Sequence, residues 1–191
     1  MQDATQLYEE MKKCSLCKLR QNCLQVVPAI GNTTNPLLMI IGDAPSEKED
    51  EEGEPFVGKA GFVLRDALRD TGIINRQNTV MTNTVKCKPP NNKFPTKDIS
   101  TICFSRWLKQ EIAIIKPKRM LLLGNVPLSY VLGLSKISTC RGTWYSYEGI
   151  RTMATFHPSY ICRQDAQGDM DTREKWERDI MVVAEEIKKL V

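Results

Sequence analysis

The sequence predicts an α/β fold in which helices cover both faces of a parallel sheet. Two continuous apolar runs, LLMIIG at 37–42 and RMLLLG at 119–124, have the length and composition of buried strands. A strand that is buried on both faces is apolar throughout, and this pattern is typical of parallel sheets. Strand-like segments also alternate with helix-like segments, which favours helices packed on each side of the sheet.

The first half of the chain contains two expected helices and two expected strands. Residues 3–13 have the pattern of a short helix, and the strand 37–42 follows. Apolar residues recur at helical spacing over 60–71, where Gly72 provides a stop signal. The β-branched segment TVMTNTV predicts the next strand over 79–85.

The second half continues the alternation of helix and strand. A longer helix is expected over 99–115, and Pro117 ends it before the buried strand 119–124. The remaining expected elements are a short helix over 127–132, a hairpin arm over 143–149, a strand over 152–159 that runs into a loop, and an amphipathic closing helix over 170–191.

The length of 191 residues suits a single domain over 1–191, whose N-terminal segment 1–35 contains the first of the candidate cluster-binding cysteines. No run approaches the ~20 apolar residues of a membrane span. The first ten residues, MQDATQLYEE, are acidic and polar and do not resemble a secretory signal. We therefore expect a soluble cytoplasmic protein that does not bind membranes and whose cysteines are reduced.

Four cysteines have the arrangement of a metal centre. Cys14 and Cys17 form a close pair, and Cys87 and Cys103 supply a distant pair. Four thiolates can hold zinc or an iron–sulfur cluster. The single histidine, His157, is far from all four in sequence, which argues against a mixed Cys/His zinc site, and the long second spacing favours the cluster. The alternative is that these cysteines are reduced and pack as small apolar residues. The same packing is expected for the other three cysteines, Cys23, Cys140 and Cys162, although Cys23 could substitute as a ligand.

The net charge of +4 hides an uneven distribution. Residues 47–54 contain six acids and one lysine, so the rest of the chain carries a net charge of +9. A basic surface of this size is compatible with a polyanionic partner such as nucleic acid.

The ends of the expected parallel strands collect a set of polar groups. Asp43, Asn83 and His157 each follow a strand, and Phe56 lies in a nearby loop. Ligands of parallel α/β folds bind beyond these strand ends. An aromatic ring stacks on a planar base, and an asparagine amide both donates to and accepts from its edge. A histidine can stabilise a developing oxyanion, and a carboxylate can orient water.

Several separated segments resemble the family 4 uracil-DNA glycosylases: GDAPSEKEDEEGEPFVGKAG (42–61), TNTVKCKPPNNKFPT (82–96), RGTWYSYEGI (141–150) and FHPSYICR (156–163). The resemblance covers almost the whole chain. It implies a three-layer α/β/α fold with a central four-stranded parallel sheet, and a 4Fe–4S cluster held by Cys14, Cys17, Cys87 and Cys103. It also implies a uracil site formed by Gly42, Asp43, Ala44, Phe56, Asn83 and His157.

The implied activity is that of a monofunctional, monomeric enzyme that flips uracil out of DNA and hydrolyses its glycosidic bond, which begins base excision repair. Asp43 and His157 would be the catalytic pair. The DNA contacts expected after the last strand are Pro158, Ser159 and Arg163. No motif lysine suggests a lyase step, and no histidine-containing loop suggests covalent capture. Protein partners in replication or repair are not indicated.

One position departs from the family pattern. Glutamate is usual where this chain has Asp43, and glycine is usual where it has Ser46. The shorter acid keeps its charge but would hold water differently, and Glu47 lies close enough in sequence to contribute. Two alternatives therefore stay open: a non-catalytic module that binds DNA or uracil, and a glycosylase for another deaminated base such as hypoxanthine or xanthine.

Overall fold

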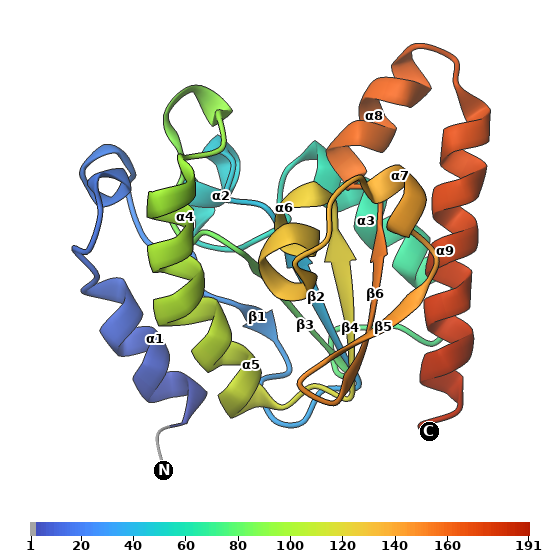
Figure 1. Ribbon diagram of the computed structural model, residues 1–191, viewed down its shortest axis with the longest axis horizontal. Coiled ribbons are helices and arrows are strands. Elements are labelled where there is room, and N and C mark those ends of the chain that lie inside the picture. The colour runs from blue at the N-terminus through green and yellow to red at the C-terminus, as the bar shows by residue number, and fades with distance from the viewer. Residues whose placement is uncertain (1–2) are drawn as a thin grey trace.

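A six-stranded sheet forms the centre of the protein (Figure 1). The computed structural model describes residues 3–191, except for the side chain of Asn92. The strand order is β1-β3-β2-β4-β6-β5. The four inner strands are parallel: β3 (Thr79–Asn83), β2 (Leu38–Gly42), β4 (Arg119–Leu123) and β6 (Ile150–Thr155). The predicted α/β fold with four central parallel strands is confirmed.

Two antiparallel edge strands make the sheet wider than the four strands expected. β5 (Trp144–Tyr147) pairs with β6 and forms the predicted hairpin arm. β1 (Ile30–Gly31) pairs with β3 on the other edge and is too short to leave a pattern in the sequence. Gly31 has φ +108°, and a Cβ atom there would lie 2.2 Å from the Thr79 carbonyl oxygen, so this close pairing requires glycine.

Helices cover both faces of the sheet, as Figure 1 shows. One face packs against α3 (Lys59–Asp70), α8 (Pro158–Ala166) and α9 (Met170–Lys188). The other face packs against α1 (Ala4–Lys12) and a continuous helical stretch. That stretch comprises α4 (Lys97–Cys103), η3 (Phe104–Leu108) and α5 (Lys109–Ile115). The three expected helices over 3–13, 60–71 and 99–115 are therefore confirmed.

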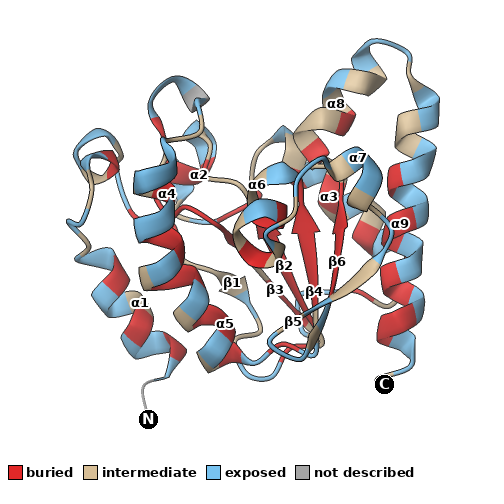
Figure 2. Cartoon of the chain, viewed as in Figure 1, coloured by how far each residue is buried: buried red, intermediate tan, exposed pale blue. Residues whose placement is uncertain are grey.

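The side chains of β2 alternate between the two cores. Leu38 and Ile40 pack under α3 and α9, whereas Met39 and Ile41 pack toward α5. All four side chains are fully buried, and buried residues line both sides of the central strands (Figure 2). This alternation explains why the segment is apolar at every position.

Short elements connect these layers: η1 (Lys18–Asn22), α2 (Glu47–Glu52), η2 (Pro90–Asn92), α6 (Asn125–Pro127), η4 (Leu128–Leu132) and α7 (Ile137–Cys140). The acidic segment at 47–52 is helical because Ser46 and Glu49 form a capping box at its start. The prediction of a loop after β6 is wrong, because a helix begins there. His157 instead caps α8, and Pro158 occupies its first turn, where proline fits well.

Candidate active site

A cavity of about 250 Å³ opens at the carboxyl ends of the parallel strands. It brings together most of the residues predicted from the sequence. Its lining includes Asp43, Ala44, Phe56, Asn83, His157 and Ser159, together with Pro45, Ser46, Glu49, Gly58, Lys59, Ala60, Pro89 and Phe94. Segments that are more than a hundred residues apart in sequence therefore meet at one site, because parallel strands end at the same edge of the sheet.

Phe56 forms one wall of the cavity and has an unusual backbone. Its φ angle is +60°, in the left-handed region that residues with a Cβ atom rarely occupy. Two glycines make room for it. A Cβ atom on Gly42 would lie 2.7 Å from the Phe56 ring, and one on Gly61 would lie 1.7 Å from the Phe56 carbonyl oxygen. Gly42 thus shapes the site although its own atoms do not line the cavity.

Asn83 ends β3 and is almost completely buried. Its Nδ2 donates a hydrogen bond to Glu49 Oε2 over 3.3 Å. This bond decides which end of the amide is the donor and leaves Oδ1 as an acceptor. Burial raises the pKa of Glu49, and hydrogen bonds from Ser46, Phe56 and Asn83 oppose that shift.

Glu49 was missed as a site residue by the sequence reasoning, which pointed to Glu47 instead. Glu47 is exposed, whereas Glu49 is buried and lines the cavity. The available signal was the spacing of Ser46 and Glu49, which forms a capping box and turns this carboxylate inward.

A buried ion pair holds the backbone of Asn83. Lys86 Nζ donates to the Asn83 carbonyl oxygen over 2.6 Å and to Glu111 Oε2 over 2.5 Å. Both charged side chains are essentially inaccessible to solvent. Thr82 Oγ1 also contacts both of them. The end of β3 is therefore anchored by a charged network rather than by the ladder alone.

His157 lines the cavity, and one of its ring nitrogens is used for structure. The Ser159 amide donates to His157 Nδ1 over 3.1 Å, and the Ser159 hydroxyl lies 2.8 Å from the same atom. Because Nδ1 accepts a hydrogen bond from an amide, the neutral ring carries its proton on Nε2. Burial, with a contribution from the nearby Arg163 charge, lowers the pKa of His157 to about 4. The ring is therefore a neutral donor at physiological pH.

Asp43 follows β2 and carries an unpaired carboxylate oxygen. Its Oδ1 is buried and has no hydrogen-bond partner among the described residues. Desolvation raises the pKa of Asp43 to about 7. A Cβ atom on Gly124, at the end of β4, would lie 3.5 Å from this oxygen and 3.1 Å from the His157 Cβ atom. Asp43 and His157 therefore flank the same glycine.

The cysteines predicted as ligands gather at a second place, between the N-terminal segment and α4. A narrow pocket there is lined by Cys14, Cys17, Cys87 and Cys103. Cys23 packs against the same cluster. Two N–H groups point at sulfur atoms over 3.3 Å: the Trp107 indole donates to Cys14 Sγ, and the Lys86 amide donates to Cys103 Sγ.

A cavity that joins an amide, a neutral imidazole, a carboxylate and an aromatic ring is suited to a flat, uncharged heterocycle. The amide can read its edge, and the imidazole N–H can stabilise negative charge on it. The sequence profile of the uracil DNA glycosylase superfamily matches residues 28–181. The chain belongs to this superfamily.

Three curated relatives place the chain within the superfamily. It is 39% identical over 160 residues to a type-4 uracil-DNA glycosylase of Thermotoga maritima, with 81% of each chain covered. It is 35% identical to a type-4 uracil-DNA glycosylase of Pyrobaculum aerophilum, over 86% of this chain and 87% of the relative. A type-4 uracil-DNA glycosylase of Archaeoglobus fulgidus is 29% identical over 97% of this chain and 94% of its own. The resemblance to family 4 is confirmed.

The four thiols line one narrow pocket, and their chemistry fits an iron–sulfur cluster. Among residues 3–191, no group of three or more Cys, His, Asp or Glu side chains converges closely enough to hold a metal ion. Burial and neighbouring sulfur atoms raise the pKa of Cys87 far above its ordinary range, and burial raises that of Cys103 to about 12. Buried thiols of this kind ionise only when a cation joins them.

Of the three predicted DNA contacts, Ser159 lines the cavity, whereas Pro158 and Arg163 do not. Pro158 is buried in the first turn of α8, while Arg163 is exposed on the same helix and lies outside the cavity lining. The Arg163 guanidinium lies 5.8 Å from the Tyr160 ring. The sequence reasoning missed Lys59, which is exposed and lines the cavity mouth.

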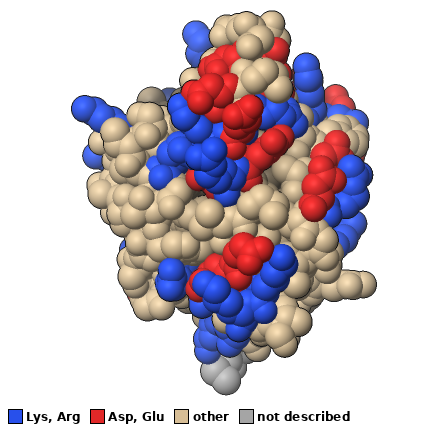
Figure 3. Space-filling model, turned by 90° about the vertical axis from the view of Figure 1, so that its right-hand side faces the viewer, with Lys and Arg blue, Asp and Glu red and all other residues tan. Residues whose placement is uncertain are grey.

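The face that carries α8 and α9 mixes cations and acids closely, as Figure 3 shows. Arg173 pairs with Asp165 and with Glu177, and Lys188 pairs with Glu185. Opposite charges that lie this close largely neutralise one another. Among the described residues, no helix has the length and apolar content needed to cross a bilayer.

Proposed function

We propose that the chain is a monofunctional uracil-DNA glycosylase that begins base excision repair. It would flip uracil out of DNA and hydrolyse the glycosidic bond. The observation that carries this proposal is the single cavity shared by Asn83, His157, Asp43 and Phe56. The type-4 uracil-DNA glycosylases of Thermotoga maritima and Pyrobaculum aerophilum align with most of the chain and support the same activity.

Asn83 selects the base in this mechanism. Its Oδ1 accepts the N3–H of uracil, and the Nδ2 hydrogen that Glu49 leaves free donates to O4. Cytosine has an acceptor at N3 and an amino donor at position 4, so both contacts would be mismatched. Phe56 stacks on the flipped ring. Glu49 acts as a positioning residue because it fixes the orientation of the amide.

His157 stabilises the leaving group. The bond between C1′ of the sugar and N1 of uracil breaks, and its electron pair leaves with the base. Negative charge develops on O2 of uracil, and the neutral Nε2–H of His157 donates toward it. Because burial keeps the ring neutral, the histidine acts as a fixed hydrogen-bond donor and no proton has to be transferred to the base.

Asp43 stabilises the positively charged sugar and positions the attacking water. The sugar gains positive charge as the bond breaks, and the ionised carboxylate stabilises it. A water molecule held by the unpaired Oδ1 then adds to C1′ and gives a proton to the carboxylate. The products are free uracil and an abasic site in the DNA.

A 4Fe–4S cluster would be held by Cys14, Cys17, Cys87 and Cys103. The cluster would cross-link the N-terminal segment to the segment before η2 and to the end of α4. The two N–H groups directed at Cys14 and Cys103 suit thiolate ligands.

The test of the cluster is iron content and absorbance near ~400 nm in anaerobically purified protein, with about four irons per chain expected. Cys87→Ser should abolish both signals, and Cys23→Ser, the matched control, should retain them. Loss of the signals only in Cys23→Ser would assign Cys23 as a ligand instead.

The DNA would lie across the cavity mouth of a monomer that acts in the cytoplasm. Pro158 and Ser159 would face the gap left by the flipped base. Lys59 is an exposed cation that lines the opening, and the charge of the exposed Arg163 acts on His157, so both side chains would contact phosphates.

A panel of labelled oligonucleotides tests the function directly. Each strand carries one uracil, cytosine, thymine, hypoxanthine or xanthine, and enzyme is in excess. Alkaline cleavage reports abasic sites, and mass spectrometry of the small-molecule fraction identifies the released base. The proposal expects free uracil and no other base. Release of hypoxanthine or xanthine instead of uracil would reassign the substrate, and binding without release would contradict catalysis.

A further inference from the structure

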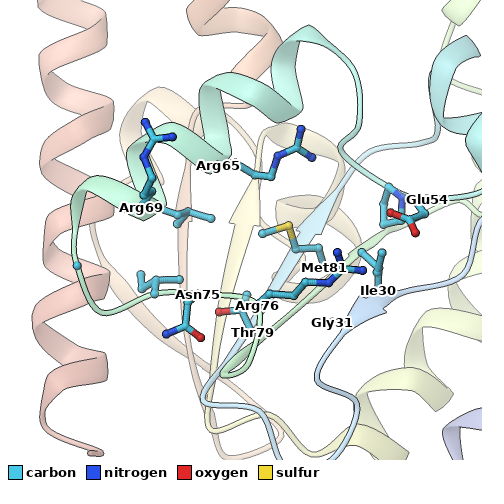
Figure 4. Close-up of a pocket in the computed structure, with 13 residues that line it drawn as sticks. Ile30, Gly31, Glu54, Arg65, Arg69, Asn75, Arg76, Thr79 and Met81 are labelled. Atoms are coloured by element: carbon cyan, nitrogen blue, oxygen red, sulfur yellow. The ribbon is translucent and has the colours of Figure 1, made fainter.

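A second cavity, of about 420 Å³, lies between α3 and the β1–β3 edge of the sheet (Figure 4). We call it the edge pocket. It is lined by Ile30, Gly31, Glu54, Pro55, Arg65, Leu68, Arg69, Gly72, Ile74, Asn75, Arg76, Thr79 and Met81. It shares no lining residue with the uracil cavity. Its size lies within the range of pockets that take small organic ligands.

The walls of the edge pocket are apolar. Leu68 and Ile74 are buried beneath it, and Met81 and Ile30 present half-buried side chains from β3 and β1. Met81 projects into the middle of the space in Figure 4. A planar or apolar body would be covered by these side chains, and methionine adapts readily to a flat ring.

The charges around the edge pocket are mostly positive. Three arginines line it, against the single carboxylate of Glu54. Arg69 is engaged by Asp66 over 3.1 Å and points away from the space. Arg65 and Arg76 approach from opposite sides, toward the end where Glu54 lies (Figure 4). Arg76 has no ion-pair or hydrogen-bond partner among the described residues. Two guanidinium groups in this arrangement suit a phosphate, which they can bind in forked geometry.

Arg65 also connects the edge pocket to the uracil cavity. Its Nη1 donates to the Phe56 carbonyl oxygen over 2.6 Å. Phe56 is the residue held at φ +60°, so this bond supports a backbone that is otherwise unfavourable. A ligand that draws the guanidinium toward itself would weaken that support.

We propose that the edge pocket binds a small organic phosphate with a planar body, and that Arg65 couples this binding to the position of Phe56. The apolar walls cover the ring, Arg76 and Arg65 hold the phosphate, and bound ligand slows excision. The binding site stands on its own geometry; the coupling rests on the proposed glycosylase function.

Isothermal titration calorimetry tests the binding site, with full-length protein, dAMP as the probe and inorganic phosphate as the comparison. We expect saturable binding of dAMP and weaker binding of phosphate alone, because phosphate lacks the ring. Arg76→Gln should weaken dAMP binding on the order of ten-fold, as expected for the loss of a charged hydrogen-bond partner. Asn83→Ala should leave it unchanged. Absence of binding at millimolar dAMP, equal affinity for phosphate, or loss of binding only in Asn83→Ala would overturn the site.

Single-turnover excision from a uracil oligonucleotide tests the coupling. Saturating dAMP should lower the excision rate of the wild-type enzyme at least about three-fold. This factor corresponds to a part of the free energy that one charged hydrogen bond contributes. Arg76→Gln should excise at the wild-type rate without ligand and resist the inhibition. An unaffected rate at saturating dAMP would overturn the coupling. A chain that binds dAMP but never releases uracil would instead contradict the proposed function and leave the site intact.

Discussion

The Ser159 amide donates a hydrogen bond to His157 Nδ1 over 3.1 Å, and this contact fixes how the histidine can act. The same imidazole caps α8 and lines the cavity, so Nδ1 is used by the fold and Nε2 is left for the ligand. A residue at the junction of β6 and α8 is held rigidly by both elements. The proposed electrophile is therefore preorganised before DNA arrives.

Replacement of His157 by alanine should lower the single-turnover rate of uracil excision on the order of 10²-fold or more, because an oxyanion donor is lost. Rapid-quench assays with enzyme in excess measure this rate. Ser159→Ala is the matched control. It removes the hydroxyl but keeps the backbone amide, so a change of only a few-fold is expected. A near-wild-type rate for His157→Ala would remove the histidine from the mechanism.

Asn83→Asp should lower uracil excision and relax the rejection of cytosine, because the protonated acid offers a different donor and acceptor pattern. The ratio of excision rates on uracil and cytosine strands is the measurement. Glu49→Gln provides a separate test of positioning. It should reduce uracil excision without creating cytosine excision, since the Asn83 amide loses its orientation but keeps its chemistry. Equal rates for wild type and Asn83→Asp on uracil would exclude the amide from base recognition.

The carboxylate of Asp43 gives the excision rate a defined pH dependence. Its pKa is raised to about 7 by burial, and the ionised form is the active one. The rate should therefore rise as pH increases through about 7. His157, with a pKa of about 4, stays neutral across this range. A rate independent of pH between 5 and 9 would contradict an essential carboxylate.

The same pKa shift makes a prediction about stability. Because the folded-state pKa of Asp43 lies above the ordinary value of 3.8, the folded protein binds the proton more tightly than the unfolded chain. Stability contributed by this residue is therefore lost as pH rises from about 4 to about 7. Asp43→Asn should unfold at a higher urea concentration than wild type at pH 8. At pH 4 the two should unfold together, and a constant difference at all pH values would refute the buried charge.

The buried pair of Lys86 and Glu111 should be sensitive to the loss of one partner. Glu111→Leu leaves the Lys86 ammonium uncompensated and should lower the free energy of unfolding by about 3–5 kcal/mol. Urea denaturation measures the loss. The double variant Lys86→Met with Glu111→Leu should recover much of it, because no buried charge remains. If the double variant is as unstable as Glu111→Leu, the loss comes from packing rather than from charge.

The sequence predicted the parts of the protein whose patterns are local. The apolar runs of β2 and β4 are unbroken because both of their faces are covered, and the helical repeat of α3 is regular. The strand-end residues followed from topology, since parallel strands end at one edge. The four proposed ligand cysteines could be grouped by spacing, but Cys23 joins them through tertiary packing alone.

Other features depend on contacts that no local pattern encodes. β1 is two residues long and exists because Gly31 allows a close approach to Thr79. Glu49 lies in an acidic run that looks solvated, and only the turn of α2 directs it to Asn83. The edge pocket requires α3 to lie beside β1 and β3, so its arginines carry no signal in the sequence.

In the proposed mechanism, the cavity at the strand ends holds a flipped uracil, and Asp43 makes its removal possible. The most direct measurement compares wild type and Asp43→Ala on one uracil oligonucleotide, with single-turnover excision and DNA affinity recorded in parallel. We expect wild type to release uracil. Asp43→Ala should bind the same DNA with comparable affinity but should release uracil at least about a hundred-fold more slowly. Equal release by both proteins would contradict the role of Asp43, and binding without release by wild type would contradict the enzyme.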